Sequence, residues 1–186
     1  MNYKKQAALE AAKLVKKNQA IGLGAGSTIA WLVEALTADA ELVNSLQFVC
    51  ASADTAQRVA DANLKLVDAS SLTHIDLYFD GCDQLDHKLN ALKSGGGIHT
   101  DEKALAAMAH EFIMLGDDSK FSHTLNTSVP LTIEVVPAAI TATMQLLHQH
   151  FNINTITVRT NETGTNISTS RNCALINVQF NQLPEL

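Results

Sequence analysis

Two acidic side chains stand close together in the segment Asp80-Gly81-Cys82-Asp83, directly after an apolar stretch. Two carboxylates on one turn can face the same small polar ligand and move protons between its hydroxyl groups. The same residues are also typical of a solvated turn in which Asp only forms the turn. Taken alone, the segment favours the solvated turn. A chemical role for the two aspartates can therefore be inferred only together with other segments.

A glycine-rich segment, Gly22-Leu23-Gly24-Ala25-Gly26-Ser27-Thr28, precedes an amphipathic stretch. Glycines let the backbone approach an anion, and the start of a helix favours phosphate. Ser27 stands where a dinucleotide-binding motif needs its third glycine, and the Gly-Lys-Ser/Thr of a P-loop is missing. The segment therefore predicts either a phosphate-binding loop or a tight strand-to-helix turn capped by Ser27.

A third segment runs from Lys93 through Ser94 and the glycines at 95–97 to Lys103. The glycine run can form a concave group of backbone N–H donors for an anion, and Lys93 can neutralise developing negative charge. Glu102 falls in the first turn of a predicted helix, where it is either a base or an acid that only stabilises the helix terminus. A base at this position needs burial or neighbouring carboxylates, because the helix terminus favours the charged form.

A fourth segment, Asp117-Asp118-Ser119-Lys120, also follows an apolar stretch. Lys120 is either a ligand-binding cation or a solvated surface lysine, and in isolation the second interpretation is the better one.

Together the four segments supply an anion-binding loop, two acids, a cation and a base. That set fits proton transfer next to a carbonyl group.

Alternating strands and helices must position these segments. The apolar stretches at 20–24, 46–51, 75–79 and 111–115 predict strands, with a further possible strand at 64–67. Helices are predicted at 2–18, from Ser27 onward, at 54–62 and at 100–110 by their apolar periodicity. The alternation predicts an α/β fold with a doubly wound, mostly parallel sheet, Rossmann-like and in three layers. Ligands of such sheets bind beyond the carboxyl ends of the strands, where the four segments lie.

The pattern changes after Asn126. Strands are predicted at 131–136, 155–159 and 174–180, and a helix at 138–150. We therefore expect a catalytic α/β domain over 1–126 and a small α+β subdomain over 127–186.

Bulk composition excludes several classes of protein. The net charge of −6, with no clustered basic face, argues against nucleic-acid binding. No apolar stretch reaches the roughly 18 residues of a membrane span, and the polar N-terminus is unlike a signal peptide. Three scattered cysteines suggest reduced thiols in the cytoplasm. His148 and His150 lack further ligands at suitable spacing, so no metal site is expected.

In combination and order, the four segments resemble the ribose-5-phosphate isomerase type A family. The matching pieces are Gly-Leu-Gly-Ala-Gly-Ser-Thr at 22–28, Asp-Gly-Cys-Asp at 80–83, Lys-Ser-Gly-Gly-Gly at 93–97 with Glu102-Lys103, and Asp-Ser-Lys at 118–120. The resemblance covers about residues 1 to 180. It implies a pentose phosphate pathway enzyme that interconverts ribose 5-phosphate and ribulose 5-phosphate through an enediolate, with neither metal nor organic cofactor.

The resemblance also assigns roles to residues. Glu102 is the implied base, Asp80 and Asp83 assist ring opening and handle the O1 and O2 protons, and Lys93 stabilises the enediolate oxygen. The implied substrate-binding residues are Ala25, Gly26, Ser27, Thr28, Gly81, Cys82, Ser94, Gly95, Gly96, Lys120 and Lys4. A homodimer or higher homo-oligomer is expected.

Three positions depart from the family's pattern. Ala25 replaces a threonine or similar hydroxyl, Gln84 replaces a glutamate, and Ser94 replaces a glycine. The chain also ends earlier than family members normally do, which leads us to expect an incomplete sheet and subdomain.

Two other functions compete with the isomerase. One is a sugar-phosphate sensor, which would keep the phosphate loop but need no base, and the other is an inactive paralogue. The combination of Lys93, Glu102 and both aspartates favours the enzyme, and no helix-turn-helix of a repressor is present in the sequence.

Overall fold

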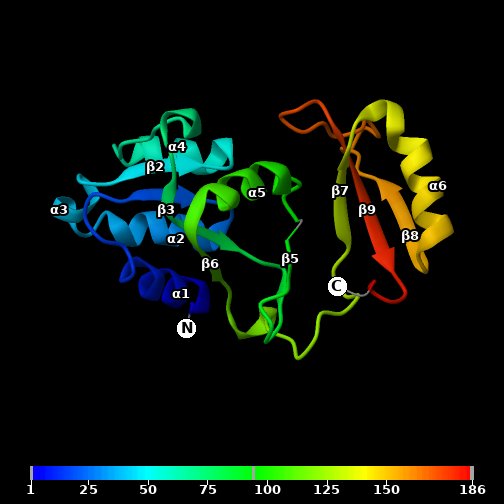
Figure 1. Ribbon diagram of the computed structural model, residues 1–186, viewed down its shortest axis with the longest axis horizontal. Helices are drawn as coiled ribbons and strands as arrows, with labels where there is room; N and C mark the ends of the chain where they lie inside the picture. Colours follow the sequence, from blue (N-terminus) through cyan, green and yellow to red (C-terminus); the bar gives the residue numbers. More distant parts are fainter. Residues whose placement is uncertain (1, 94, 185–186) are drawn as a thin grey trace. The chain divides into compact units, whose positions relative to one another are not determined.

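Two compact units make up the protein (Figure 1), and the computed structural model describes residues 2–93 and 95–184. The first unit comprises Met1–Cys82 and Ile98–Lys120, and the second comprises Asp83–Gly97 and Phe121–Leu186. The chain thus passes from the first unit to the second directly after Cys82 and returns at Ile98. None of the helices in this described part of the chain has the length and apolarity needed to cross a bilayer.

A four-stranded parallel sheet forms the centre of the first unit. Its strands lie in the order β2-β1-β3-β6, with β1 at Ala20–Leu23, β2 at Gln47–Cys50, β3 at Ile75–Gly81 and β6 at Ala109–Leu115. The chain leaves β1 toward β2 on one side and returns to β3 on the other, so the winding direction changes between β1 and β3. The α/β fold with a parallel, doubly wound sheet is therefore confirmed.

Helices cover both faces of this sheet, as Figure 1 shows for α1 and α5. Leu77 and Phe79 of β3 pack in a core with α1 and α2, whereas Tyr78 packs with Leu105 of α5. Alternate residues of a strand face opposite sides, so the two groups of helices lie on opposite faces. The helices of this unit are α1 (Tyr3–Ala12), α2 (Ser27–Leu36), α3 (Ala40–Val43), α4 (Ala53–Asp61) and α5 (His99–Met108).

Two sequence predictions for this unit were wrong in detail. The first helix ends at Ala12 instead of residue 18, because the N–H groups of Lys13 and Leu14 bond to carbonyls three residues back and tighten the turn. The possible strand at 64–67 is reduced to an isolated bridge between Phe48 and Leu66.

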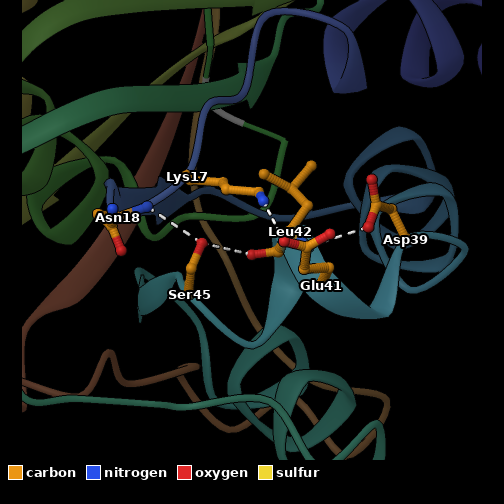
Figure 2. A network of polar contacts seen from close by, with 6 residues as sticks. All are labelled: Lys17, Asn18, Asp39, Glu41, Leu42 and Ser45. Carbon is orange, nitrogen blue, oxygen red and sulfur yellow. Dashed lines mark hydrogen bonds and ion pairs between the residues drawn. The ribbon is translucent and has the colours of Figure 1, made fainter.

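A polar network holds the turn before β1 against α3 (Figure 2). Lys17 pairs with Glu41, and the N–H of Asn18 donates to the Ser45 hydroxyl at 3.1 Å. That hydroxyl in turn donates to the carbonyl of Leu42 at 2.6 Å. The network therefore joins the two segments that lead into the neighbouring strands β1 and β2.

The second unit contains two small antiparallel sheets. Its larger sheet has the order β7-β9-β8, with β7 at Leu131–Val135, β8 at Ile153–Val158 and β9 at Ala174–Phe180. The helix α6 (Ile140–His150) contributes Met144 and Leu147 to the core of this unit. The smaller sheet pairs β4 (Gln84–Leu85) with β5 (Ala91–Leu92) inside the predicted polar loop.

Candidate active site

The glycine-rich loop after β1 packs tightly against the end of β3. The N–H of Gly24 donates to the carbonyl of Phe79 at 2.8 Å. A Cβ on Gly24 would lie 2.1 Å from the Cγ of Asp80, so only glycine leaves room for that carboxylate. Gly26 has φ +100°, a conformation that side chains rarely allow. The glycine-rich loop and Asp80 therefore pack directly against each other. Ala25, which stands between Gly24 and Gly26, is half-buried.

The loop opens directly onto the N-terminus of α2. Gly26 is the N-cap, so the expectation that Ser27 caps this helix was wrong, and no side chain of the described residues caps this terminus. Ser27 and Thr28 occupy the first turn, where free N–H groups and the helix dipole favour an anion. The Ser27 hydroxyl accepts a hydrogen bond from Nζ of Lys4 at 3.1 Å.

Two lysines lie close to one aspartate near this loop. Hydrogen bonds from Ser119, and then the positive charges of Lys120 and Lys4, lower the pKa of Asp117 below its ordinary value. Because Lys4 also reaches Ser27, the two cations and the start of α2 belong to one anion-attracting region of the first unit. Lys120 is half-buried, which distinguishes it from a fully solvated surface lysine.

The side chain of Asp80 is buried, with 1% of its surface exposed. Its Oδ1 accepts from the N–H of Gly81 at 2.7 Å, and its Oδ2 accepts from the hydroxyl of Tyr78 at 3.0 Å. Gly81 pairs with Leu115 at the end of the sheet. Cys82 follows, half-buried, and its Sγ would lie 3.5 Å from a Cβ built on Gly116.

Glu102 lies in the first turn of α5 and is buried, with 8% of its surface exposed. Burial, and after it the negative charges of Asp80 and Glu102, raise the pKa of Tyr78 far above its ordinary value. Both carboxylates therefore act on the same buried hydroxyl. The structure thus brings Asp80 and Glu102 into one neighbourhood, although 22 positions separate them in the chain (102 − 80).

Two residues that support this region were missed by the sequence analysis. Tyr78 sits in an apolar strand and resembles any core aromatic residue in the sequence. Thr55, buried in α4, donates to the carbonyl of Gly24 at 2.8 Å and accepts from the Ser52 hydroxyl at 2.9 Å. The bond from Thr55 to Gly24 joins segments 31 positions apart and leaves no signal in the sequence, whereas Ser52 lies only three residues before Thr55.

Asp83 and Lys93 lie in the second unit, directly before β4 and directly after β5. Gln84 pairs with Leu92 and the N–H of Asp83 donates to the carbonyl of Leu92 at 2.8 Å, so the register sets Asp83 beside Lys93. Oδ2 of Asp83 also accepts from the N–H of Gly95 at 3.2 Å. Gly95 and Gly96 are exposed, and Ser94 lies outside the described residues.

Arg159, a further residue missed by the sequence analysis, holds this glycine run in place. Its guanidinium donates to the carbonyl of Gly95 at 3.2 Å, to Thr132 Oγ1 at 2.9 Å and to Asn177 Oδ1 at 2.8 Å. Gly97, at φ +70°, leaves no space for a Cβ, which would lie 2.4 Å from Leu175 Cδ1. The loop that carries Lys93 is thereby tied to the larger sheet of its own unit.

Gln84, one of the departures from the family's pattern, has a structural role. Its amide nitrogen donates to Asn126 Oδ1 at 2.8 Å and to Ser128 Oγ at 2.5 Å, and its oxygen accepts from the N–H of Asn126 at 3.0 Å. The side chain is buried, with 6% of its surface exposed. A glutamate could not make the two donor contacts, so the amide fits this position.

Comparison with known proteins gives a consistent result. Residues 47–186 match the family model described as ribose 5-phosphate isomerase A (phosphoriboisomerase A). The ribose-5-phosphate isomerase A of Wigglesworthia glossinidia brevipalpis is 36% identical over 138 residues, which are 74% of this chain and 62% of that protein. The enzyme of the same name from Prochlorococcus marinus (strain MIT 9312) is 32% identical over 181 residues, 95% of this chain and 76% of that protein.

Solved structures agree with these relatives. A D-ribose-5-phosphate isomerase in complex with phospho-erythronic acid superposes with a TM-score of 0.93 at 28% identity, covering 100% of this chain and 82% of that one. The ribose 5-phosphate isomerase A of Methanocaldococcus jannaschii gives a TM-score of 0.89 at 30% identity, covering 97% and 80%. The chain therefore spans less than two thirds of the first relative and about four fifths of the two solved chains.

Proposed function

The chain belongs to the ribose 5-phosphate isomerase A family, and we propose that it interconverts ribose 5-phosphate and ribulose 5-phosphate. The observation that carries this proposal is a pair of buried carboxylates in one unit: Asp80 accepts a hydrogen bond from the Tyr78 hydroxyl at 3.0 Å, and, after burial and the charge of Asp80, the charge of Glu102 also raises the pKa of Tyr78. The anion-attracting start of α2 lies in the same unit and packs on Asp80 through Gly24. An anchored phosphate and a buried base are the two parts that the reaction needs.

The phosphate binds at the start of α2 in this proposal. Backbone N–H groups of Gly26, Ser27 and Thr28 are the donors, with Ala25 and Gly81 forming walls. Lys4 and Lys120 supply positive charge, which Asp117 partly balances. Binding energy gained at this remote group holds the sugar carbons in a reactive position and lowers the entropic part of the barrier.

Glu102 acts as the base. Its carboxylate removes the proton from C2 of the open-chain aldose, and the electrons of the C–H bond move to give an enediolate. Glu102 then returns a proton to C1, either the same one or one that has exchanged with solvent. The aldehyde becomes a hydroxymethyl group and C2 becomes the ketone, so atoms and charge balance without an oxidant.

Asp83 and Lys93 complete the proposed chemistry. Asp83 is the second acid of the segment Asp80-Gly81-Cys82-Asp83, one of the pieces that carry the resemblance to the family. Asp80 and Asp83 assist ring opening and carry protons on O1 and O2. Lys93 stabilises the negative charge that develops on the enediolate oxygen, and Cys82, Ser94, Gly95 and Gly96 are further proposed substrate-binding residues.

Phospho-erythronic acid, the ligand of one solved relative, fits the same scheme. Its carboxylate is planar and carries two oxygens on one carbon, which resembles the charge distribution of an enediolate. We propose that it competes with ribose 5-phosphate on this chain. The proposed mechanism uses side chains and backbone N–H groups of this chain, because proton transfer needs a base and electrostatic stabilisation and no redox group.

We also propose a homodimer or higher homo-oligomer and a location in the cytoplasm. The three free cysteines, Cys50, Cys82 and Cys173, support a reducing compartment. Burial raises the pKa of Cys50 to about 12, which keeps that thiol protonated and unreactive.

A turnover assay with a matched substrate tests the proposed function. Purified protein is incubated with ribose 5-phosphate in the presence of EDTA, and ribulose 5-phosphate formation is followed over time. We expect turnover, competitive inhibition by phospho-erythronic acid, and a large fall in kcat/KM with ribose, which lacks the phosphate anchor. Saturable binding of ribose 5-phosphate without any ribulose 5-phosphate would overturn the proposal in favour of a sugar-phosphate binding protein.

A further inference from the structure

A cluster of two histidines and one aspartate lies at the amino ends of β3 and β6, at the other end of the sheet from Asp80. One ligand atom from each of His74, Asp76 and His110 lies within 4.8 Å of the other two. Ile75 pairs with Ala109 and Leu77 with Glu111, which sets Asp76 beside His110 on the neighbouring strand. Residues 36 positions apart in the chain (110 − 74) are thus brought together by the sheet register.

The three side chains already face one another. The imidazole rings of His74 and His110 stack with centroids 4.4 Å apart and an interplanar angle of 11°. Nε2 of His74 lies 3.7 Å from Oδ1 of Asp76. One ring nitrogen or carboxylate oxygen of each side chain therefore lies near the other two, and rotation of the imidazoles out of the stack would let their lone pairs converge on a cation.

Neighbouring groups orient two of these side chains. Oδ2 of Asp76 accepts the N–H of Ala20 at 2.7 Å, which fixes the carboxylate and leaves Oδ1 directed toward His74. Oγ1 of Thr73 lies 3.2 Å from Nδ1 of His74. When Nδ1–H donates to Thr73, the lone pair of Nε2 faces Asp76, and such outer contacts are the usual support of metal-binding histidines.

We propose that His74, Asp76 and His110 form a binding site for a divalent transition metal, with Zn²⁺ as the ion that the ligand set fits best. Two nitrogens and one carboxylate oxygen suit Zn²⁺, and tetrahedral ligands lie about 3.3–3.5 Å from one another. The exposed His74 and His110 side chains can close the remaining distance by small rotations. Water fills the fourth position.

This site has a structural role. Within the first unit β6 is an edge strand, and a bound ion ties its His110 to Asp76 of β3, which already holds Ala20 of β1. Of the residues proposed for catalysis in this unit, Asp80 stands at the carboxyl end of β3 and Glu102 in the first turn of α5, so neither belongs to this cluster. The inference is therefore independent of the proposed isomerase function, and bound metal stabilises the sheet without entering the reaction.

Metal binding to the intact chain tests the inference. EDTA-treated, dialysed protein is titrated with Zn²⁺ by calorimetry, and bound zinc is counted after gel filtration. We expect one Zn²⁺ per chain and, at 100 times the dissociation constant, a rise in Tm of about 5–10 °C. His110→Ala should weaken binding by more than the ~10–100-fold that loss of an outer contact costs, and Thr73→Val by about tenfold.

Controls make each outcome decisive. His148→Ala, at an exposed position on α6, should bind Zn²⁺ like the wild type. Circular dichroism confirms that His110→Ala is folded, and Co²⁺ in place of Zn²⁺ reports the ligands by absorption. Absence of saturable one-to-one binding, unchanged affinity in folded His110→Ala, or a thiolate-to-cobalt charge-transfer band would each overturn the proposal.

Discussion

The two groups of proposed catalytic residues are held by different kinds of structure. Asp80 and Glu102 stand on a buried parallel sheet and its covering helix, with 1% and 8% of their surfaces exposed. Asp83 and Lys93 flank a pair of two-residue strands, near glycines that are exposed. The first group is positioned by core packing, and the second by a few polar contacts.

This difference suggests a division of labour. A proton must move over a short, defined path, so the base and first acid benefit from rigid packing. Electrostatic stabilisation by Lys93 acts over a longer range and tolerates a loop that is held mainly by Arg159 and Asp83. Substitutions in the two groups should therefore differ in what they change and by how much.

The largest effect is expected at Glu102. Glu102→Gln keeps the shape but removes the base, so kcat should fall by about 10²–10⁴-fold while affinity for phospho-erythronic acid is retained. Kinetics beside calorimetry measure both quantities. Glu162→Gln, at an exposed position in the second unit, is the matched control and should leave kcat unchanged. Lost affinity with intact turnover would assign Glu102 to substrate binding instead.

Lys93→Met should lower kcat by about 10²–10³-fold, because the developing charge of the enediolate loses its cation. In contrast to Glu102→Gln, this substitution should also weaken binding of phospho-erythronic acid, whose carboxylate carries that charge already. Lys88→Met, in the exposed turn between β4 and β5, is the control for loss of positive charge. If Lys93→Met and the wild type bind phospho-erythronic acid with equal affinity, Lys93 does not stabilise the charge of the ligand.

Tyr78→Phe tests whether a hydrogen bond from this strand residue positions Asp80. The change removes the hydroxyl that donates to Asp80 at 3.0 Å but keeps the packing of the ring. A hydrogen bond to a charged group contributes about 1.5–3 kcal/mol, and we expect roughly a tenfold loss of kcat with KM nearly unchanged. If KM rises instead while kcat is kept, Tyr78 does not position the acid.

The smallest effect on turnover is expected for Gln84→Glu. This change removes two hydrogen-bond donors and buries a carboxylate, so the second unit should lose about 1–3 kcal/mol of unfolding free energy while kcat stays close to that of the wild type. Urea denaturation measures the loss, with Gln149→Glu on the exposed face of α6 as control. Unchanged stability would show that the amide contacts contribute nothing.

Sequence patterns predicted the main strands of both units because their buried positions are apolar, and α2 because its apolar residues are periodic. β9 begins and ends at the predicted residues, and α2 begins at Ser27 as expected. The glycine-rich loop and Asp80 could be identified because their residue types are required by backbone geometry. Glycine at 24 and 26 is demanded by a close carboxylate and a positive φ.

Other features depend on contacts that no local pattern records. The β4–β5 pair is too short for a period of two to be visible, and α3 has only four residues. The roles of Thr55 and Arg159 come from partners in distant segments, and that of Tyr78 from a hydrogen bond to Asp80 that an apolar strand pattern does not reveal. The same holds for the histidine cluster, because the sheet register alone brings His110 to Asp76.

The central claim is that Glu102 carries a proton between C2 and C1. The most direct test is to equilibrate ribose 5-phosphate with the enzyme in D₂O through many turnovers and to locate deuterium by NMR. The account predicts solvent deuterium at C1 of ribulose 5-phosphate and at C2 of ribose 5-phosphate, with no incorporation by Glu102→Gln in the same time. Rapid interconversion by the wild type with no solvent deuterium at either carbon would contradict it, because that result indicates direct hydride transfer.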